Sequence, residues 1–159
     1  MPRAPFQILV YPFIRQHEGI RQHEGSAVEY ALFRRTDNKI WQAIAGGGED
    51  DELPLESAQR EAHEEAGISS KSPFLQLDTI VPIRAVGFPD RQLWGDDVLV
   101  IPQYCFGVEV DDRQLQLSAE HTEYVWLPFD EAHEQAEYDG NKTALWELDQ
   151  RLQRPGVRL

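Results

Sequence analysis

Short apolar runs separated by polar turns predict a chain that is rich in β-strands. The first run, Phe6–Phe13 (FQILVYPF), is apolar almost throughout and is predicted to form a strand. Further strands are predicted over Ala27–Arg35, Lys39–Ala45, Phe74–Ile83, Val98–Val110 and Tyr124–Leu127. Three consecutive glycines, Gly46–Gly48, interrupt this pattern. We expect them to allow backbone turns ahead of a helix, because glycine adopts conformations that other residues disfavour.

Apolar residues at three- and four-residue spacing predict helices between some of these strands. The clearest helix covers Leu53–Ala66, with Pro54 in its first turn and Gly67 where a helix C-terminus favours glycine. Shorter helices are predicted over Asp130–Glu137 and Thr143–Leu152. Since no linker or change of composition divides the chain, we expect one α/β (α+β) domain over residues 1–159.

A polar segment between the first two strands contains a perfect tandem repeat. Ile14–Gly19 and Ile20–Gly25 both read IRQHEG. Such a short polar repeat cannot form a solenoid. Residues 14–25 are therefore interpreted as a duplicated surface loop, which tolerates insertion at small entropic cost. The alternative, a metal site between His17 and His23, has nothing in the sequence to fix its geometry.

The composition limits the classes of partner. The chain has 159 residues with 15 Lys and Arg against 28 Asp and Glu, a net charge of −13. That charge disfavours nucleic-acid polymers but allows a small phosphorylated substrate that a divalent cation bridges to carboxylates. A lone cysteine, Cys105, fits a reducing, cytoplasmic compartment. No apolar run approaches the ~20 residues that cross a membrane, so no membrane partner is expected. A monomer and a homodimer both remain open.

The chemistry is concentrated between Gly46 and Ile68, where the sequence reads GGGEDDELPLESAQREAHEEAGI. On a helix, Glu61, Glu64 and Glu65 fall within an arc of ~100°. Carboxylates this close repel one another, and a cation relieves the repulsion. Hard cations such as Mg²⁺ or Mn²⁺ prefer oxygen ligands, so this face is a candidate metal site. The small apolar face beside it, expected to lie against a sheet, comprises Leu55, Ala58, Ala62 and Ala66.

The same stretch resembles the Nudix box, whose pattern is G, five residues, E, seven residues, R-E-U-x-E-E-x-G-U, with U an apolar residue. Gly46, Glu52 and the run Arg60–Ile68 match this spacing. The chain departs from the family at Asp51, where a glycine is common, and at Ala62, a small residue for a U position; neither change removes a carboxylate. The resemblance implies a Nudix-type α/β/α sandwich with a mixed sheet, and hydrolysis of a nucleoside diphosphate linked to another group.

The resemblance also implies a role for each residue of the box. Arg60 orients Glu61, Glu52 supports the loop, and Gly46 and Gly67 are structural. The implied ligands of Mg²⁺ or Mn²⁺ are Glu61, Glu64 and Glu65.

Three segments outside the box resemble one group within the Nudix family, the dihydroneopterin triphosphate pyrophosphatases. These are Trp41-Gln42, the stretch from Ser118 to Leu127, and the tail with Asn141, Lys142, Ala144 and Leu145. In that group, a glutamate in the position of Glu120 supplies a metal ligand or positions water from a loop opposite the helix. Glu64 and Glu120 are therefore both candidates for the general base. His121 is interpreted as a packing or loop residue, with proton transfer as the alternative.

The ring of the substrate needs a flat apolar surface to stack on, and its phosphates need cationic side chains. The candidates for the stacking surface are Trp94, Trp41, Phe33 and Phe88, and each of them could equally belong to the core. The candidate cations are Arg34, Arg35, Arg84 and Arg91, since a guanidinium binds phosphate through two parallel hydrogen bonds.

The sequence thus predicts a metal-dependent pyrophosphohydrolase. Its expected substrate is a nucleoside or pterin triphosphate, dihydroneopterin triphosphate among them, cleaved to a monophosphate and pyrophosphate. One alternative is a nucleotide-pool sanitising enzyme that acts on oxidised nucleoside triphosphates, ADP-ribose or dinucleoside polyphosphates. The other is a Nudix-fold sensor that binds a nucleotide without hydrolysing it.

Overall fold

The structure, a computed structural model, describes residues 2–15 and 28–154. Ile14 and Arg15 end the first strand. The rest of the tandem repeat, including the hypothesis of a metal site between His17 and His23, lies outside the described residues.

Seven strands in the described residues form one mixed sheet. They are β1 (Arg3–Arg15), β2 (Val28–Arg35), β3 (Trp41–Gln42), β4 (Ile44–Glu49), β5 (Phe74–Arg84), β6 (Val100–Glu109) and β7 (His121–Pro128). The sheet runs β3-β2-β1-β6-β5, and in addition β4 pairs with β1 and β7 with β2. The central pair β1–β6 is parallel, and the other described pairs are antiparallel.

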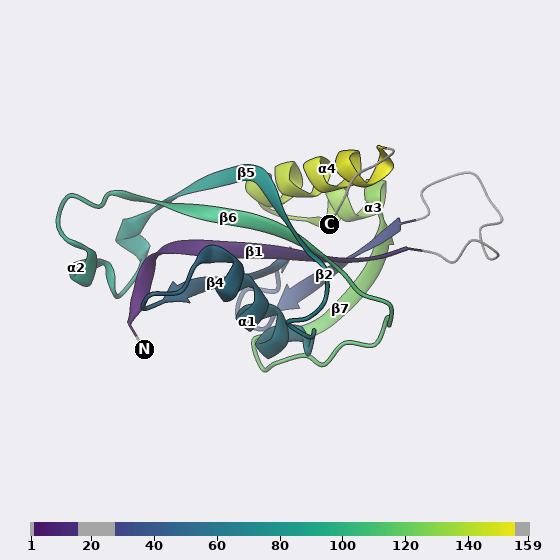
Figure 1. Cartoon of the computed structure of the whole chain (residues 1–159), viewed down its shortest axis with the longest axis horizontal. Coiled ribbons are helices and arrows are strands. Elements are labelled where there is room, and N and C mark those ends of the chain that lie inside the picture. Colours follow the sequence, from purple (N-terminus) through teal and green to yellow (C-terminus); the bar gives the residue numbers. More distant parts are fainter. Residues whose placement is uncertain (1, 16–27, 155–159) are drawn as a thin grey trace.

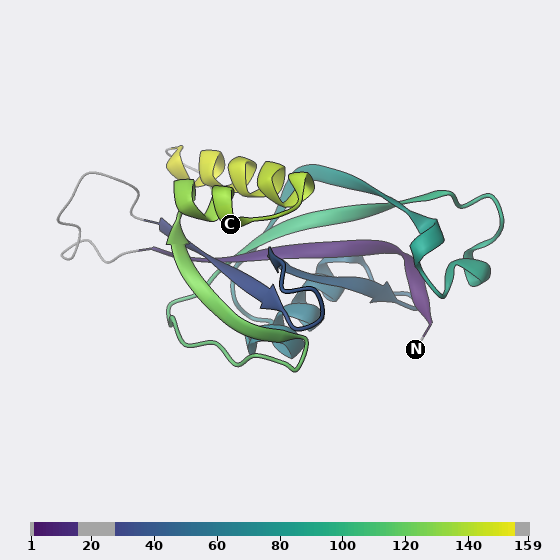
Figure 2. The ribbon, with the colours of Figure 1, turned by 180° about the vertical axis from the view of Figure 1, so that it is seen from behind.

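Helices cover both faces of this sheet (Figures 1 and 2). The helical segments are α1 (Pro54–Ala66), η1 (Ala85–Gly87), α2 (Arg91–Trp94), α3 (Phe129–Gln135) and α4 (Asp139–Gln153). Figure 1 shows α1 below the sheet and α3 and α4 above it. Each face has its own apolar core, one formed with α1 and the other with α3 and α4. The predicted α/β/α sandwich is confirmed.

The ends of α1 follow the local sequence. At the start, the Leu53 N–H donates a hydrogen bond to Glu56 Oε1 at 2.8 Å. At the end, Gly67 adopts a left-handed conformation with φ of 71°, as predicted for a helix C-terminus. The small residues Ala58, Ala62 and Ala66 are buried against the sheet. Leu55 was wrongly assigned to this face, because it lies in the first turn and is 41% exposed.

The interpretation of Gly46–Gly48 as a turn is wrong, because all three residues lie inside β4. Their lack of a side chain serves close approach instead. A Cβ atom at Gly46 would overlap the Glu61 carboxyl group, one at Gly47 the Arg3 guanidinium, and one at Gly48 the Phe6 ring. The glycines therefore make room for side chains from β1 and α1.

Two further regions differ from the expectation. The last strand begins at His121 and not at Tyr124, and η1 and α2 form a helical excursion between β5 and β6 that the sequence pattern did not predict. Within the described ranges, no helix combines the length and apolar character that a membrane crossing requires.

Candidate functional site

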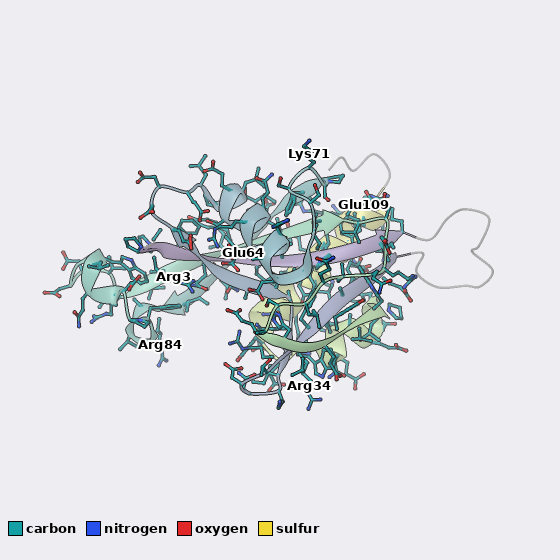
Figure 3. All side chains as sticks on the ribbon, turned by 90° about the horizontal axis from the view of Figure 1, so that it is seen from below. Arg3, Arg34, Glu64, Lys71, Arg84 and Glu109 are labelled. Carbon is teal, nitrogen blue, oxygen red and sulfur yellow. The ribbon has the colours of Figure 1, made fainter. Side chains whose placement is uncertain are left out.

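The acidic face of α1 lies at the rim of its contact with the sheet. Glu61 and Glu65 are 7% and 5% exposed, because the alanines next to them hold the helix close to the strands. Glu64 points outward and is exposed, and Figure 3 shows it on α1 as seen from below the sheet. Three carboxylates thus share one face, two of them out of bulk water.

Arg60 joins this face to the loop before the helix. Its guanidinium donates to Glu52 Oε2 at 2.8 Å and to the Gly47 carbonyl oxygen at 2.8 Å. It also donates to Glu61 Oε1 at 2.9 Å. The hydrogen bond from Arg60 lowers the pKa of Glu52 to about 2, although burial opposes this change. Glu52 also accepts a hydrogen bond from Ser57 Oγ at 2.7 Å, so it fixes the loop against α1.

Glu61 is a carboxylate whose charged form is disfavoured by its surroundings. Burial raises its pKa to about 7, even though the hydrogen bond from Arg60 favours the charged form. The negative charges of Glu64 and Glu65 raise the pKa further. Space for this carboxyl group exists because Gly46 has no side chain. The site therefore holds an excess of negative charge that a cation would stabilise.

Glu65 connects α1 to the turn that precedes β7. It accepts a hydrogen bond from Ser118 Oγ at 2.6 Å, and His121 Nδ1 lies 3.3 Å from its Oε2 atom. Burial alone would raise the pKa of Glu65, but these two partners hold it below its ordinary value. Glu120 lies in the same turn. Burial and the charge of Glu65 raise the pKa of Glu120.

His121 is a buried residue in this arrangement. Its side chain is 1% exposed, and its ring packs against Phe33 with 5.4 Å between the ring centroids. This location agrees with the interpretation as a packing residue, although the contact with Glu65 also joins it to the acidic face.

The donor set is chemically suited to a divalent cation. Glu61, Glu64, Glu65 and Glu120 supply only carboxylate oxygens, which hard cations prefer. In residues 2–15 and 28–154, no three His, Cys, Asp or Glu side chains are already arranged around one point as a metal site requires. Glu61 is turned to Arg60 and Glu65 to Ser118, so binding would require these side chains to rotate.

A pocket of about 630 Å³ opens beside these carboxylates. Glu61 and Glu120 line one part of it, together with Arg35 from the end of β2. Phe88 and Tyr138 supply aromatic side chains to the same pocket. The pocket thus combines acids, cationic side chains and aromatic rings, which is the mixture that a phosphorylated ring compound requires.

Only some of the predicted substrate-binding residues line the pocket. Arg35 and Phe88 line the pocket, whereas Phe33 does not, because it is 0% exposed within the core on the α1 side. Trp41 packs against the opposite core, below α3 and α4. Trp94 does not line the pocket but packs against the Phe88 ring, with 5.9 Å between the ring centroids. Of the four predicted aromatic candidates, Phe88 is the one that lines the pocket.

The lining residues that sequence reasoning missed include Arg3, Gln7, Gln42 and Tyr138. Arg3 is held through its backbone. Its N–H donates to Asp90 Oδ2 at 2.6 Å, and its carbonyl oxygen accepts a hydrogen bond from Trp94 Nε1 at 2.7 Å. The excursion between β5 and β6 is thereby attached to the start of β1.

Comparison with known proteins gives one family. The NUDIX domain model matches residues 20–146. A dihydroneopterin triphosphate diphosphatase of Haemophilus influenzae is 27% identical over 116 residues, which cover 72% of this chain and 73% of the relative. An asymmetrical bis(5'-nucleosyl)-tetraphosphatase of Sus scrofa is 32% identical over 130 residues, 81% of this chain and 84% of the relative.

A solved structure resembles the whole chain. It is that of a Listeria monocytogenes protein assigned as a NUDIX hydrolase, with a TM-score of 0.82 and 34% identity. The similarity covers 98% of this chain and 99% of that protein.

Proposed function

Since the chain belongs to the NUDIX family and is a hydrolase of that family, we propose that it is a divalent-cation-dependent pyrophosphohydrolase of nucleoside or pterin triphosphates. Cleavage of the P–O bond between the α- and β-phosphates would give a monophosphate and pyrophosphate. The observation that carries this proposal is the pocket, in which Glu61 and Glu120 lie together with Arg35. Dihydroneopterin triphosphate is the first candidate, in line with the name of the H. influenzae relative.

In this proposal the carboxylates hold Mg²⁺ or Mn²⁺. The ligands are Glu61, Glu64, Glu65 and Glu120. When bound, such a cation neutralises phosphate charge and makes a water molecule more acidic. Burial, and after it the charges of neighbouring glutamates, raise the pKa values of Glu61 and Glu120, and a bound cation would offset both effects.

Side chains of the protein orient the carboxylate, contact the phosphates and accept the proton. Arg60 holds the Glu61 carboxylate in place, and Arg35 contacts the phosphate chain of the substrate. A carboxylate oxygen of Glu120 or Glu64 accepts the proton of the attacking water, which forms the new bond to phosphorus while pyrophosphate leaves. Charge stabilisation and positioning supply most of the rate gain.

A second candidate substrate is a dinucleoside polyphosphate. It is favoured by the S. scrofa tetraphosphatase, which has the higher identity of the two curated relatives named above. The same carboxylates would serve, and the bond that is cleaved would lie between two phosphates of the longer chain.

A substrate panel with Mg²⁺ tests the proposal. It contains dihydroneopterin triphosphate, common and oxidised nucleoside triphosphates, ADP-ribose and a dinucleoside tetraphosphate, with pyrophosphate and monophosphate as measured products. We expect Glu64→Gln and Glu65→Gln to lower turnover by orders of magnitude, whereas Glu134→Gln, an exposed residue of α3, leaves it unchanged. Full activity of both site variants would refute the assignment. Nucleotide binding without any product would instead indicate a sensor.

A further inference from the structure

Two buried glutamine side chains line the pocket without a function in the scheme above. Gln7, on β1, is 9% exposed, and Gln42, on β3, is 6% exposed. Within the described part of the chain, neither side-chain amide makes a hydrogen bond with the protein. Neither amide is among the fully buried polar atoms without a partner, so both are accessible from the pocket and can pair with a ligand there.

The backbone holds Gln42 firmly on both sides. The Trp41 carbonyl oxygen accepts a hydrogen bond from the Glu137 N–H at 3.2 Å, and the Ala43 N–H donates to Asn141 Oδ1 at 2.9 Å. The side-chain amide of Gln42 therefore projects from a fixed backbone position, as recognition of one defined edge of a ligand requires.

Gln7 projects from the centre of the sheet. It is in register with Gly47 of β4 on one side and with Gln103 of β6 on the other. Because β1 is hydrogen-bonded to both neighbours, this position is also preorganised. Gln103 is itself buried at 7% exposure but does not line the pocket.

Aromatic side chains complete this part of the pocket. Phe88 and Tyr138 line it, and Trp94 packs behind Phe88. Aromatic faces bind planar rings of any substitution pattern, so they cannot by themselves distinguish one heterocycle from another. Selectivity requires groups that pair with the polar edge of a ring.

We propose that Gln7 and Gln42 read the edge of a planar heterocycle on the substrate. A glutamine amide offers an acceptor oxygen beside donor hydrogens, and it pairs through two hydrogen bonds with a ring edge that has a donor beside an acceptor. Nucleobases and pterins have such edges. This inference rests on the proposed function, because it assigns the ring-binding part of the same pocket and leaves the acids and Arg35 to the phosphates.

Kinetics with matched substrates test the assignment. The substrates are a triphosphate with a substituted ring (GTP or dihydroneopterin triphosphate), purine riboside triphosphate, which lacks the exocyclic groups, and inorganic tripolyphosphate, which lacks a ring. We expect Gln7→Met and Gln42→Met to lower kcat/KM for the substituted ring about 10- to 100-fold, mainly through KM. Hydrolysis of tripolyphosphate should not change. Gln103→Met is the matched control and should behave as wild type.

A binding measurement separates this inference from the proposed function. Neopterin and guanosine carry no phosphate, and their binding to the metal-free protein can be followed by fluorescence or calorimetry. If no triphosphate is hydrolysed, but these compounds bind the wild type and not the methionine variants, the inference holds and the proposed function fails. If hydrolysis proceeds and the variants bind both compounds as the wild type does, the inference is overturned.

A second variant guards against misfolding. Gln42→Glu keeps the size of the side chain but replaces the amide donor with an acceptor. We expect it to unfold at the wild-type temperature and to lose the preference for GTP over purine riboside triphosphate. An unchanged preference in this folded variant would contradict the role of Gln42.

Discussion

The Arg60 guanidinium and the Glu52 carboxylate form a two-point hydrogen bond, from Nε to Oε2 at 2.8 Å and from Nη2 to Oε1 at 3.0 Å. The same guanidinium also donates to the Gly47 carbonyl oxygen and to Glu61. One planar group therefore joins α1, β4 and the loop between them. Lysine has the charge but not the planar fork, so it cannot make all these bonds.

We expect Arg60→Lys to lower the free energy of unfolding by about 1–3 kcal/mol, because charged partners lose directed hydrogen bonds. Turnover should also fall, since Glu61 loses its orienting contact. Urea unfolding and steady-state kinetics measure the two effects. Arg154→Lys, at an exposed position, is the control. If the Arg60 variant is as stable as the wild type, the two-point hydrogen bond of the guanidinium is not needed for stability.

Gly46→Ala should weaken cation binding, because its new Cβ atom would overlap the Glu61 carboxyl group. We expect at least a ~10-fold loss of Mn²⁺ affinity by calorimetry, in the range seen when support for a metal ligand is lost. Gly47→Ala is a matched control, since the overlap there is with Arg3, whose flexible side chain can move. Equal Mn²⁺ affinities in the two variants would contradict the link between Gly46 and the Glu61 carboxylate.

Glu147 gives a pH-dependent stability. Burial alone would raise its pKa, but hydrogen bonds from Thr79, the Asp78 N–H and Arg151 hold it below the ordinary value. The charged form is thus favoured by folding, and its contribution is complete above a pH of about 4.3 and lost as the pH falls through the lowered pKa.

We therefore expect Glu147→Gln to cost about 1–3 kcal/mol at neutral pH. The difference from wild type should shrink as the solution becomes more acidic than pH ~4. Urea unfolding at a series of pH values measures this difference. Glu134→Gln should show no such trend, and a constant difference for Glu147→Gln would exclude the ionised carboxylate as its source.

Tyr30 and Asp149 provide a prediction on the other face of the sheet. Tyr30 Oη donates to Asp149 Oδ1 at 2.7 Å, and both residues are buried. Tyr30→Phe leaves the carboxylate without this donor and should cost about 1–3 kcal/mol in the free energy of unfolding.

Asp149→Asn should behave in the opposite way. Burial raises the pKa of Asp149, so the folded state favours its neutral form, and the stability it contributes is lost as the pH rises through that pKa. Asparagine keeps an acceptor for Tyr30, and the Gln153 amide can rotate to accept from the new amide. We expect a stability at neutral pH equal to or above that of the wild type, measured by thermal unfolding. A large loss would show that the negative charge itself is required.

The predictions that were confirmed depend on local signals. The helix α1 could be located because Pro54, Gly67 and the spacing of its alanines all act within a few residues of one another. The grouping of Glu61, Glu64 and Glu65 follows from helical geometry alone.

The pocket could not be predicted in this way. Arg3, Gln42 and Tyr138 lie far apart in the sequence and meet only because of the strand order. Phe33 illustrates the same limit, since an aromatic residue in a strand reveals its burial only when both faces of the sheet are known to be covered. The local sequence at the glycines of β4 predicts a turn, because the side chains that need the space come from the distant segments β1 and α1.

The parallel pairing of β1 with β6 has a consequence for how the chain folds. β1 is synthesised before β6, its parallel neighbour in the sheet, which begins only at Val100. Contacts between such distant segments form late and slow the overall folding rate. During synthesis, the apolar stretch around Ile8 and Val10 therefore stays unpaired until β6 has been made. In this interval, chaperone binding would protect the nascent chain from aggregation.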